Sequence, residues 1–289
     1  MSVGGYADDN QLYLSFKPEY DGVNEKEAID IMNRCICSVR KWMLQHKLMI
    51  KDGKTEFMIV GSSKQLSKLK DCNVIVGSST IQPVDKLRNL GVIFDNQLTM
   101  VDHINHVCKI GFYQLFKLKQ IRNYFDIKTI ESLVHSFITS HIDYCNSLSA
   151  GLPEVTIKKL QRLQNAAARL IVQKSRRDSI TAILKDLHWL PVRFRVKFKI
   201  CLTVYKCLNG SGPHYLHELL QYTHKRSLRS ATNKLLVVPK MKTETFGKRS
   251  FKYCAPKYWN ELPLNLRESD NICVFKKRLK TFYFNSAFT

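Results

Sequence analysis

The chain of 289 residues lacks several features that assign proteins to common classes. None of its apolar runs approaches the roughly 18 residues that a membrane span needs, which argues against a transmembrane segment. Its nine cysteines form no CxxC pair, and no signal peptide opens the sequence, so we expect free thiols in a reducing compartment. Internal repeats and low-complexity tracts are absent too. These absences predict an intracellular protein, nuclear or cytoplasmic, without membrane contact.

Acidic side chains are scarce, and the shortage is confined to one part of the chain. The sequence holds 46 Lys and Arg against 24 Asp and Glu, a net charge of +22. Residues 1–100 are nearly neutral, with 13 basic and 12 acidic residues. The other 33 basic and 12 acidic residues all lie in 101–289. An excess of this size favours a polyanionic partner, RNA or DNA, over a basic surface that is merely soluble.

The first hundred residues show the periodicities of an α+β fold. Alternating or apolar runs predict strands, and apolar residues spaced by three and four predict a helix. The expected elements are a strand at 10–16, a helix at 25–46 capped by Asn24, a strand at 55–60, a hairpin around Gly77 and a strand at 90–95.

The periodicity becomes helical after residue 96. Three helices are expected before residue 173, and a closing helix is expected at 274–284. Residues 193–200 alternate basic and apolar as a strand does, but they also fit a longer helix. We predict the helix, because Pro191 suits a helix start and Gly210 suits a stop.

The sequence is expected to divide into three regions. Residues 1–96 form the α+β region, residues 97–210 a helical region, and residues 211–289 a basic carboxy-terminal region.

Two adjacent carboxylates, Asp8 and Asp9, stand at the start of an alternating run, where aspartate is disfavoured. Such a pair can simply make a turn. It can also hold Mg²⁺, which prefers hard oxygen ligands. Nucleotidyl transfer uses carboxylates in this way, to clamp two divalent ions about 3.5–4 Å apart.

The residues around the pair favour the second interpretation. "YADDNQLYLSF" resembles the YADD catalytic block of reverse transcriptases from non-LTR (LINE-type) retrotransposons of the jockey and chicken-repeat groups. Further blocks resemble the same family in the same order, from Tyr6 to about Phe284. They are "KTEFMIVGSS", "LRNLGVIFDNQLTMVDHI", "SFITSHIDYCNSLSAGLP", "KKLQRLQNAAARLIV", "LHWLPVRFRVKFKI" and "APKYWNELPLNLRES".

The resemblance implies a role for each matching residue. Asp8 and Asp9 would be metal-binding aspartates of the polymerase palm, with Asp8 the more direct Mg²⁺ ligand. Tyr6 would pack beside the primer end, and Gly91 would belong to the segment that grips the primer strand. Lys54 would help to protonate the pyrophosphate leaving group, with a solvated turn lysine as the alternative. Residues beyond 96 would form a thumb-like region along the template–primer duplex.

The resemblance also implies that the site is incomplete. In the family, the fingers and the first palm aspartate precede YADD, and here only "MSVGG" stands before Tyr6. We therefore expect a truncated palm remnant that lacks the third carboxylate and the strand supporting the aspartates. Such a chain would be inactive alone and would bind Mg²⁺ only in a complete palm. An upstream fingers–palm fragment is a possible partner.

The basic half sets cations next to aromatic residues, a mixture that suits phosphate neutralisation and stacking on bases. A solvated helix face is the alternative for any one cluster. The candidate nucleic-acid-binding residues are Arg176, Arg177, Arg193, Arg195, Lys197, Lys199, Lys248, Arg249 and Lys252.

Three functions remain open from the sequence. The chain can be a catalytically incomplete fragment of a reverse transcriptase, an RNA-directed DNA polymerase. It can be a non-enzymatic RNA- or DNA-binding protein derived from such an element. It can also be one part of a polymerase that assembles with a separate fingers–palm fragment.

Overall fold

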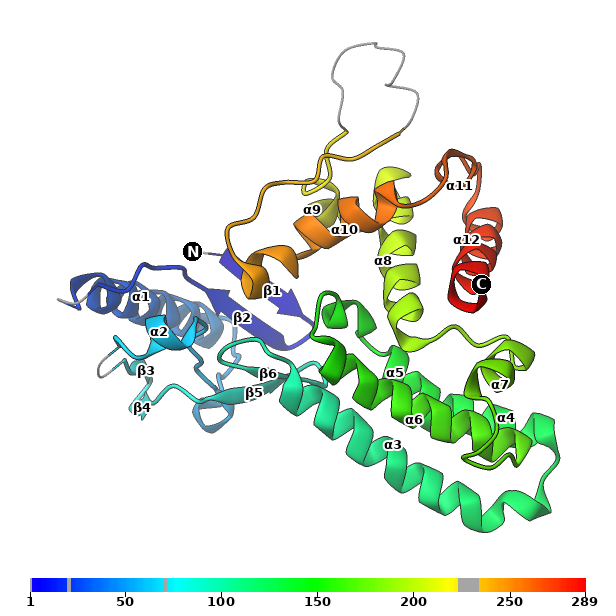
Figure 1. Cartoon of the computed structure of the whole chain (residues 1–289). Helices are drawn as coiled ribbons and strands as arrows, with labels where there is room; N and C mark the ends of the chain where they lie inside the picture. Colours follow the sequence, from blue (N-terminus) through cyan, green and yellow to red (C-terminus); the bar gives the residue numbers. More distant parts are fainter. Residues whose placement is uncertain (1, 20–21, 70–71, 223–233) are drawn as a thin grey trace. The chain divides into compact units, whose positions relative to one another are not determined.

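The computed structural model describes residues 2–19, 22–69, 72–222 and 234–289. They belong to two compact units, Met1–Thr99 and Met100–Thr289. The first combines hairpins with helices, and the second is mostly helical (Figure 1). The predicted α+β class is therefore confirmed. Among the described helices, none is both long and apolar enough to cross a membrane.

The first unit contains three antiparallel hairpins and one long helix. Each hairpin stays a separate two-stranded sheet in the described residues, pairing β1 with β2, β3 with β4, and β5 with β6. The elements are β1 (Ser2–Tyr6), β2 (Asp9–Tyr13), α1 (Val23–Gln45), a 3₁₀ turn (Asp52–Lys54), α2 (Ser63–Leu66), β3 (Val74–Val76), β4 (Ser79–Ile81), β5 (Lys86–Asn89) and β6 (Val92–Asp95).

Several predictions for this unit were wrong in detail. The residues before Tyr6 do form a strand, β1, so the support of the aspartates is present. No strand forms at 55–60, where Phe57 makes a single bridge to Pro83. Proline has no N–H to extend such a ladder. The N-cap of α1 is Gly22, whose φ of 71° suits glycine, whereas Asn24 lies inside the helix.

In the residues that the structure describes, the second unit is built mainly of helices. They are α3 (Val101–Ile121), a 3₁₀ turn (Arg122–Tyr124), α4 (Ile127–Val134), a π turn (His135–Thr139), α5 (Ser140–Asp143), a 3₁₀ turn (Asn146–Ser149), α6 (Glu154–Val172), α7 (Ile180–Asp186), α8 (Val192–Leu208), α9 (His214–His217), a π turn (Glu244–Lys248), α10 (Phe251–Asn260), α11 (Leu264–Arg267) and α12 (Ile272–Phe288).

The segment at 193–200 is helical, as predicted, and its packing explains the alternation. α8 contacts α6, α10 and α12, so it is covered on more than one side. Phe194 and Val196 are therefore both buried although they are only two residues apart. A helix surrounded in this way needs apolar residues around most of its circumference.

The cores of the predicted regions 97–210 and 211–289 are continuous. Cys201 and Tyr205 of α8 belong to the same buried cluster as Trp259 of α10 and Phe275 of α12. The aromatic ring of Tyr205 stacks on that of Phe275, with ring centroids 4.3 Å apart. The two regions therefore pack against each other within one unit.

Candidate functional site

The aspartate pair lies at the tip of the β1–β2 hairpin. Tyr6 pairs with Asp9, which leaves Ala7 and Asp8 as a two-residue loop. Ala7 has a φ of 52°, a left-handed conformation that is uncommon for residues other than glycine. Asp8 and Asp9 are both exposed. The hairpin thus presents two adjacent carboxylates to solvent from a short, tight turn.

The tip combines the aspartates with an aromatic side chain. Tyr6 is exposed and stands directly opposite Asp9, so the two side chains share one face of the hairpin. In the part of the chain that the structure describes, no group of three His, Cys, Asp or Glu residues is placed to hold a metal ion. Asp8 and Asp9 can supply some of the oxygen ligands of Mg²⁺, and further ligands are needed to complete its coordination.

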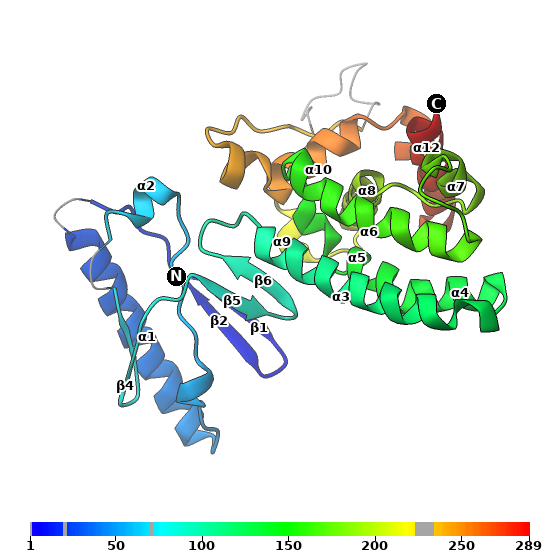
Figure 2. The ribbon, with the colours of Figure 1, turned by 60° about the horizontal axis from the view of Figure 1, so that its bottom comes forward.

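A hydrogen bond joins this hairpin to the β5–β6 hairpin, 78 positions along the chain. The side-chain Nε2 of Gln11 donates to Oδ1 of Asn89 over 2.6 Å. The two hairpins lie side by side (Figure 2). Leu90 and Gly91 form the second turn with φ values of 45° and 82°. Positive φ at both turn residues is typical of tight hairpins and is cheapest for glycine. Gly91 is therefore needed for the turn itself.

Lys54 lies in the 3₁₀ turn after α1, and its side chain is exposed. The turn is fixed by an ion pair between Arg40 and Asp52, with 2.5 Å between Nη1 and Oδ1. The pair packs against Gly77, where a Cβ atom would come within 2.6 Å of both side chains. Within the described residues, no hydrogen bond or ion pair connects Lys54 with Asp8 or Asp9. The structure therefore does not bring all the predicted catalytic residues together.

The candidate cations of the second unit fall into two groups. Arg195 is held by neighbours, since its Nη1 pairs with Asp143 Oδ2 at 2.7 Å and its Nε donates to the Leu190 carbonyl at 2.9 Å. Lys197 pairs with Glu261 at 2.8 Å, and Lys248 pairs with Glu244. These contacts give the three cations a structural role.

The remaining predicted cations differ in exposure. Arg249 is half-buried beside Gly151, where a Cβ atom would lie 2.9 Å from Arg249 Cγ. The exposed residues are Arg176, Arg177, Arg193, Lys199 and Lys252. An exposed cation can reach a phosphate without first breaking an ion pair, so these five are the stronger nucleic-acid candidates.

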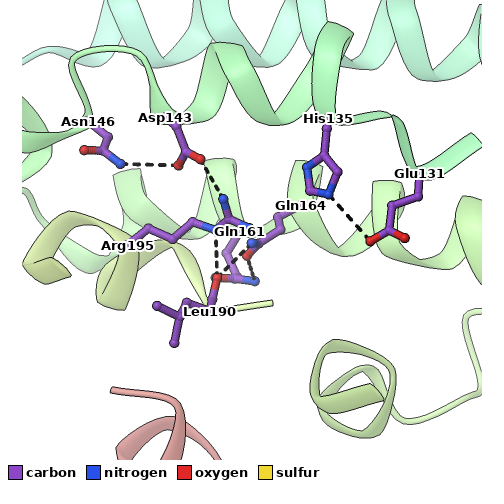
Figure 3. A network of polar contacts seen from close by, with 8 residues as sticks. All are labelled: Glu131, His135, Asp143, Asn146, Gln161, Gln164, Leu190 and Arg195. Carbon is purple, nitrogen blue, oxygen red and sulfur yellow. Dashed lines mark hydrogen bonds and ion pairs between the residues drawn. The ribbon is translucent and has the colours of Figure 1, made fainter. Parts of the chain in front are cut away.

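A polar network connects three of the sequence blocks that carry the family resemblance (Figure 3). Asp143 accepts from Arg195 of α8, and its other oxygen accepts from Asn146 Nδ2 at 3.3 Å. The Leu190 carbonyl accepts from Gln164 Nε2 of α6 at 2.9 Å as well as from Arg195. Gln161 Oε1 accepts from the backbone N–H at the start of α8 over 2.8 Å.

This network was not predicted from the sequence. Its acidic member, Asp143, is separated by 52 residues from Arg195, the cation that it binds. The only signal in the sequence was that all of them lie inside the blocks quoted above. These blocks therefore hold the helices of the second unit together, which is a structural role rather than a catalytic one.

No family model, curated protein or solved structure matches the chain. The resemblance of the YADD block stays an expectation from the sequence. The inference of function rests on the hairpins and the basic surface described above.

A buried thiol–phenol pair lies in the core of the second unit, away from the exposed cations. Cys201 Sγ of α8 and the Tyr283 hydroxyl of α12 are 3.2 Å apart. Burial is the main cause that raises the pKa of the Cys201 thiol to about 12, and it also raises the pKa of the Tyr283 hydroxyl. Because the thiolate is the reactive form, Cys201 is a core residue rather than a nucleophile.

We expect Cys201 to resist alkylation at pH 8 while the exposed Cys37 and Cys273 react. Folding also keeps the Cys201 proton bound above pH 9, where the unfolded chain releases it. Stability therefore falls as the pH rises from 9 towards the raised pKa of the folded thiol, about 12. Iodoacetamide labelling with peptide mass spectrometry measures the first effect. Urea denaturation of wild type and Cys201→Ala measures the second, and equal alkaline slopes would contradict it.

Proposed function

We propose that this chain is part of a LINE-type reverse transcriptase, to which it contributes the metal-binding hairpin of the palm and a thumb-like helical region. The observation that carries the proposal is the Gln11–Asn89 hydrogen bond, which holds the YADD hairpin beside the β5–β6 hairpin. The resemblance assigns the first hairpin to the metal ions and the second to the primer strand. Both must meet at a primer end for nucleotides to be transferred.

The chemistry follows from the tip of the first hairpin. Asp8 and Asp9 provide oxygen ligands for Mg²⁺, and Tyr6 stands on the face of Asp9, where a primer nucleotide can pack. When bound, the two ions activate the attacking hydroxyl and neutralise the phosphates. The paired strands of the hairpin hold the carboxylates next to each other before the substrate arrives.

A further polypeptide segment must complete the site. Two-metal transfer needs a third carboxylate, and the described residues place none beside Asp8 and Asp9. The first unit also has few buried apolar side chains, while Trp42, Leu44 and Met49 at the end of α1 and beyond are exposed. Exposed apolar side chains of this kind support pairing with a fingers–palm segment.

Primer extension tests the proposal directly. We expect Mg²⁺-dependent extension only when a fingers–palm fragment is added to the chain. Asp8→Asn should then lower the rate at least about 100-fold, because a catalytic metal contributes several kcal/mol of charge stabilisation. Asp30→Asn, at an exposed position of α1, is the matched control and should not change the rate. Primer extension that persists in Asp8→Asn would overturn the proposal, and so would the absence of extension when the fragment is added.

The alternative function, non-enzymatic binding of RNA or DNA, is favoured by the exposed cations of the second unit. Binding through about six phosphate contacts should weaken about 1,000-fold between roughly 50 and 200 mM salt. Fluorescence anisotropy with a labelled duplex measures this dependence. Steep salt dependence without any extension would favour the alternative, and salt-independent affinity would contradict both functions.

A further inference from the structure

One face of α3 is used for packing and the opposite face is not. Gly111 faces α6 so closely that a Cβ atom there would lie 2.4 Å from Leu163 Cδ2. On the other side of the helix, Phe112, Tyr113 and Phe116 are 45%, 55% and 62% exposed. We call these three residues, with the exposed Lys109 and Lys117, the α3 aromatic stripe.

The stripe is not explained by the core of the unit. Three large exposed aromatic side chains within five residues form an apolar patch of the kind that marks interaction sites. Lys117 Nζ lies 4.5 Å from the centroid of the Tyr113 ring, a cation–π contact at the edge of the patch. Lys109 lies one turn before Tyr113 along the helix. The patch is thus apolar in its middle and positively charged at its ends.

The spacing of the rings suits a planar ligand. Phe112 and Phe116 are one helical turn apart, about 6 Å along the axis. Two rings that hold a flat base between them need about 7 Å, since nonbonded carbons approach to 3.5–4 Å. Small rotations of the side chains therefore make room for one base. Bases of an unpaired strand expose their faces, whereas bases of a duplex are already stacked on one another.

Charge decides among the possible occupants. A second copy of the chain would bring another unit with 33 basic and 12 acidic residues against the first, and the like charges would repel. A strand with one phosphate per nucleotide is attracted instead. We propose that the α3 aromatic stripe binds single-stranded RNA or DNA. Bases stack on Phe112 and Phe116, and phosphates lie near Lys109 and Lys117.

This inference rests on the nucleic-acid binding in the proposed function and adds a preference for unpaired strands at a defined surface. The test uses the full chain with fluorescein-labelled oligothymidylate and, separately, a labelled duplex of equal length. Phe112→Ala/Phe116→Ala should weaken binding to the single strand at least about 10-fold, because stacking contributes 1–3 kcal/mol per base. Duplex affinity should change less than about 2-fold, because phosphate contacts dominate it.

Matched variants keep the test specific. Tyr215→Ala removes an exposed aromatic ring from α9 and should leave both affinities unchanged. Phe116→Trp keeps a stacking ring and should retain binding to the single strand. Circular dichroism checks that each variant is folded.

Three results would overturn the inference. The first is an equal loss of affinity for both probes, and the second is no loss of affinity for either. The third is a wild-type chain that self-associates in sedimentation while Phe116→Ala does not. If the wild type binds neither probe, the proposed nucleic-acid function fails as well. If duplex binding and primer extension are observed but the double variant leaves single-strand affinity unchanged, only this inference is overturned.

Discussion

Replacing Trp259 with alanine is expected to lower the free energy of unfolding by about 4 kcal/mol. The side chain is only 1% exposed and lies within the cluster shared by α8, α10 and α12. Its ring centroid is 6.0 Å from that of Phe275, and its Nε1 donates to the Lys234 carbonyl over 2.9 Å. The substitution therefore leaves a large cavity and removes the donor to the Lys234 carbonyl.

Urea denaturation of the full chain, followed by far-ultraviolet circular dichroism, measures this loss. Trp42→Ala is the matched control, because Trp42 is exposed on α1 and its removal should change stability by less than about 0.5 kcal/mol. Trp259→Phe keeps most of the volume and should cost less than Trp259→Ala. Equal effects of Trp259→Ala and Trp42→Ala would contradict the described core.

The second large effect is expected at Arg122, which is 7% exposed in the 3₁₀ turn after α3. Its guanidinium donates to three backbone carbonyls, those of Leu170 at 3.0 Å, Ile171 at 2.7 Å and Phe125 at 2.9 Å. Leu170 and Ile171 belong to the last turn of α6, whose carbonyls lack partners within the helix. A cation there also complements the negative end of the helix dipole.

Arg122→Met keeps the aliphatic stem and removes all three donors, so we expect it to destabilise the chain by about 3 kcal/mol. Arg122→Lys retains the charge without the planar fork and should give an intermediate loss. Arg162→Met, at an exposed position of α6, is the control and should stay within about 0.5 kcal/mol. The same urea titrations test all three variants. An unchanged free energy of unfolding in Arg122→Met would show that the carbonyls find other donors.

The spacing of apolar residues predicted those elements that pack mainly against one neighbour. The helix at 25–46, the hairpin around Gly77 and the helices up to residue 172 were recognisable because their apolar spacing faces one neighbour. The hairpin β1–β2 was missed because its first strand, "SVGGY", contains two glycines and little alternation. The residues of β1 form a strand because they pair in register with β2, and their own composition does not indicate one.

Long-range contacts limited the prediction of the site. Charge alone placed Arg193 and Arg195 in the same group, although the structure exposes the first and pairs the second with Asp143. Nothing near Arg195 in the sequence indicates that partner, which lies 52 residues away. The two hairpins are likewise joined by a hydrogen bond across 78 residues. Residue types predict what chemistry is possible, and tertiary contacts decide which side chains are free to perform it.

The central position of α8 has a consequence for how the second unit comes apart. α8 contributes to the same buried cluster as α10 and α12, and Gln161 of α6 accepts a hydrogen bond from its first turn. Loss of the carboxy-terminal helices would expose Phe194, Ile200 and Val204 to water. α8 and the carboxy-terminal helices should therefore unfold together, because they share one buried core.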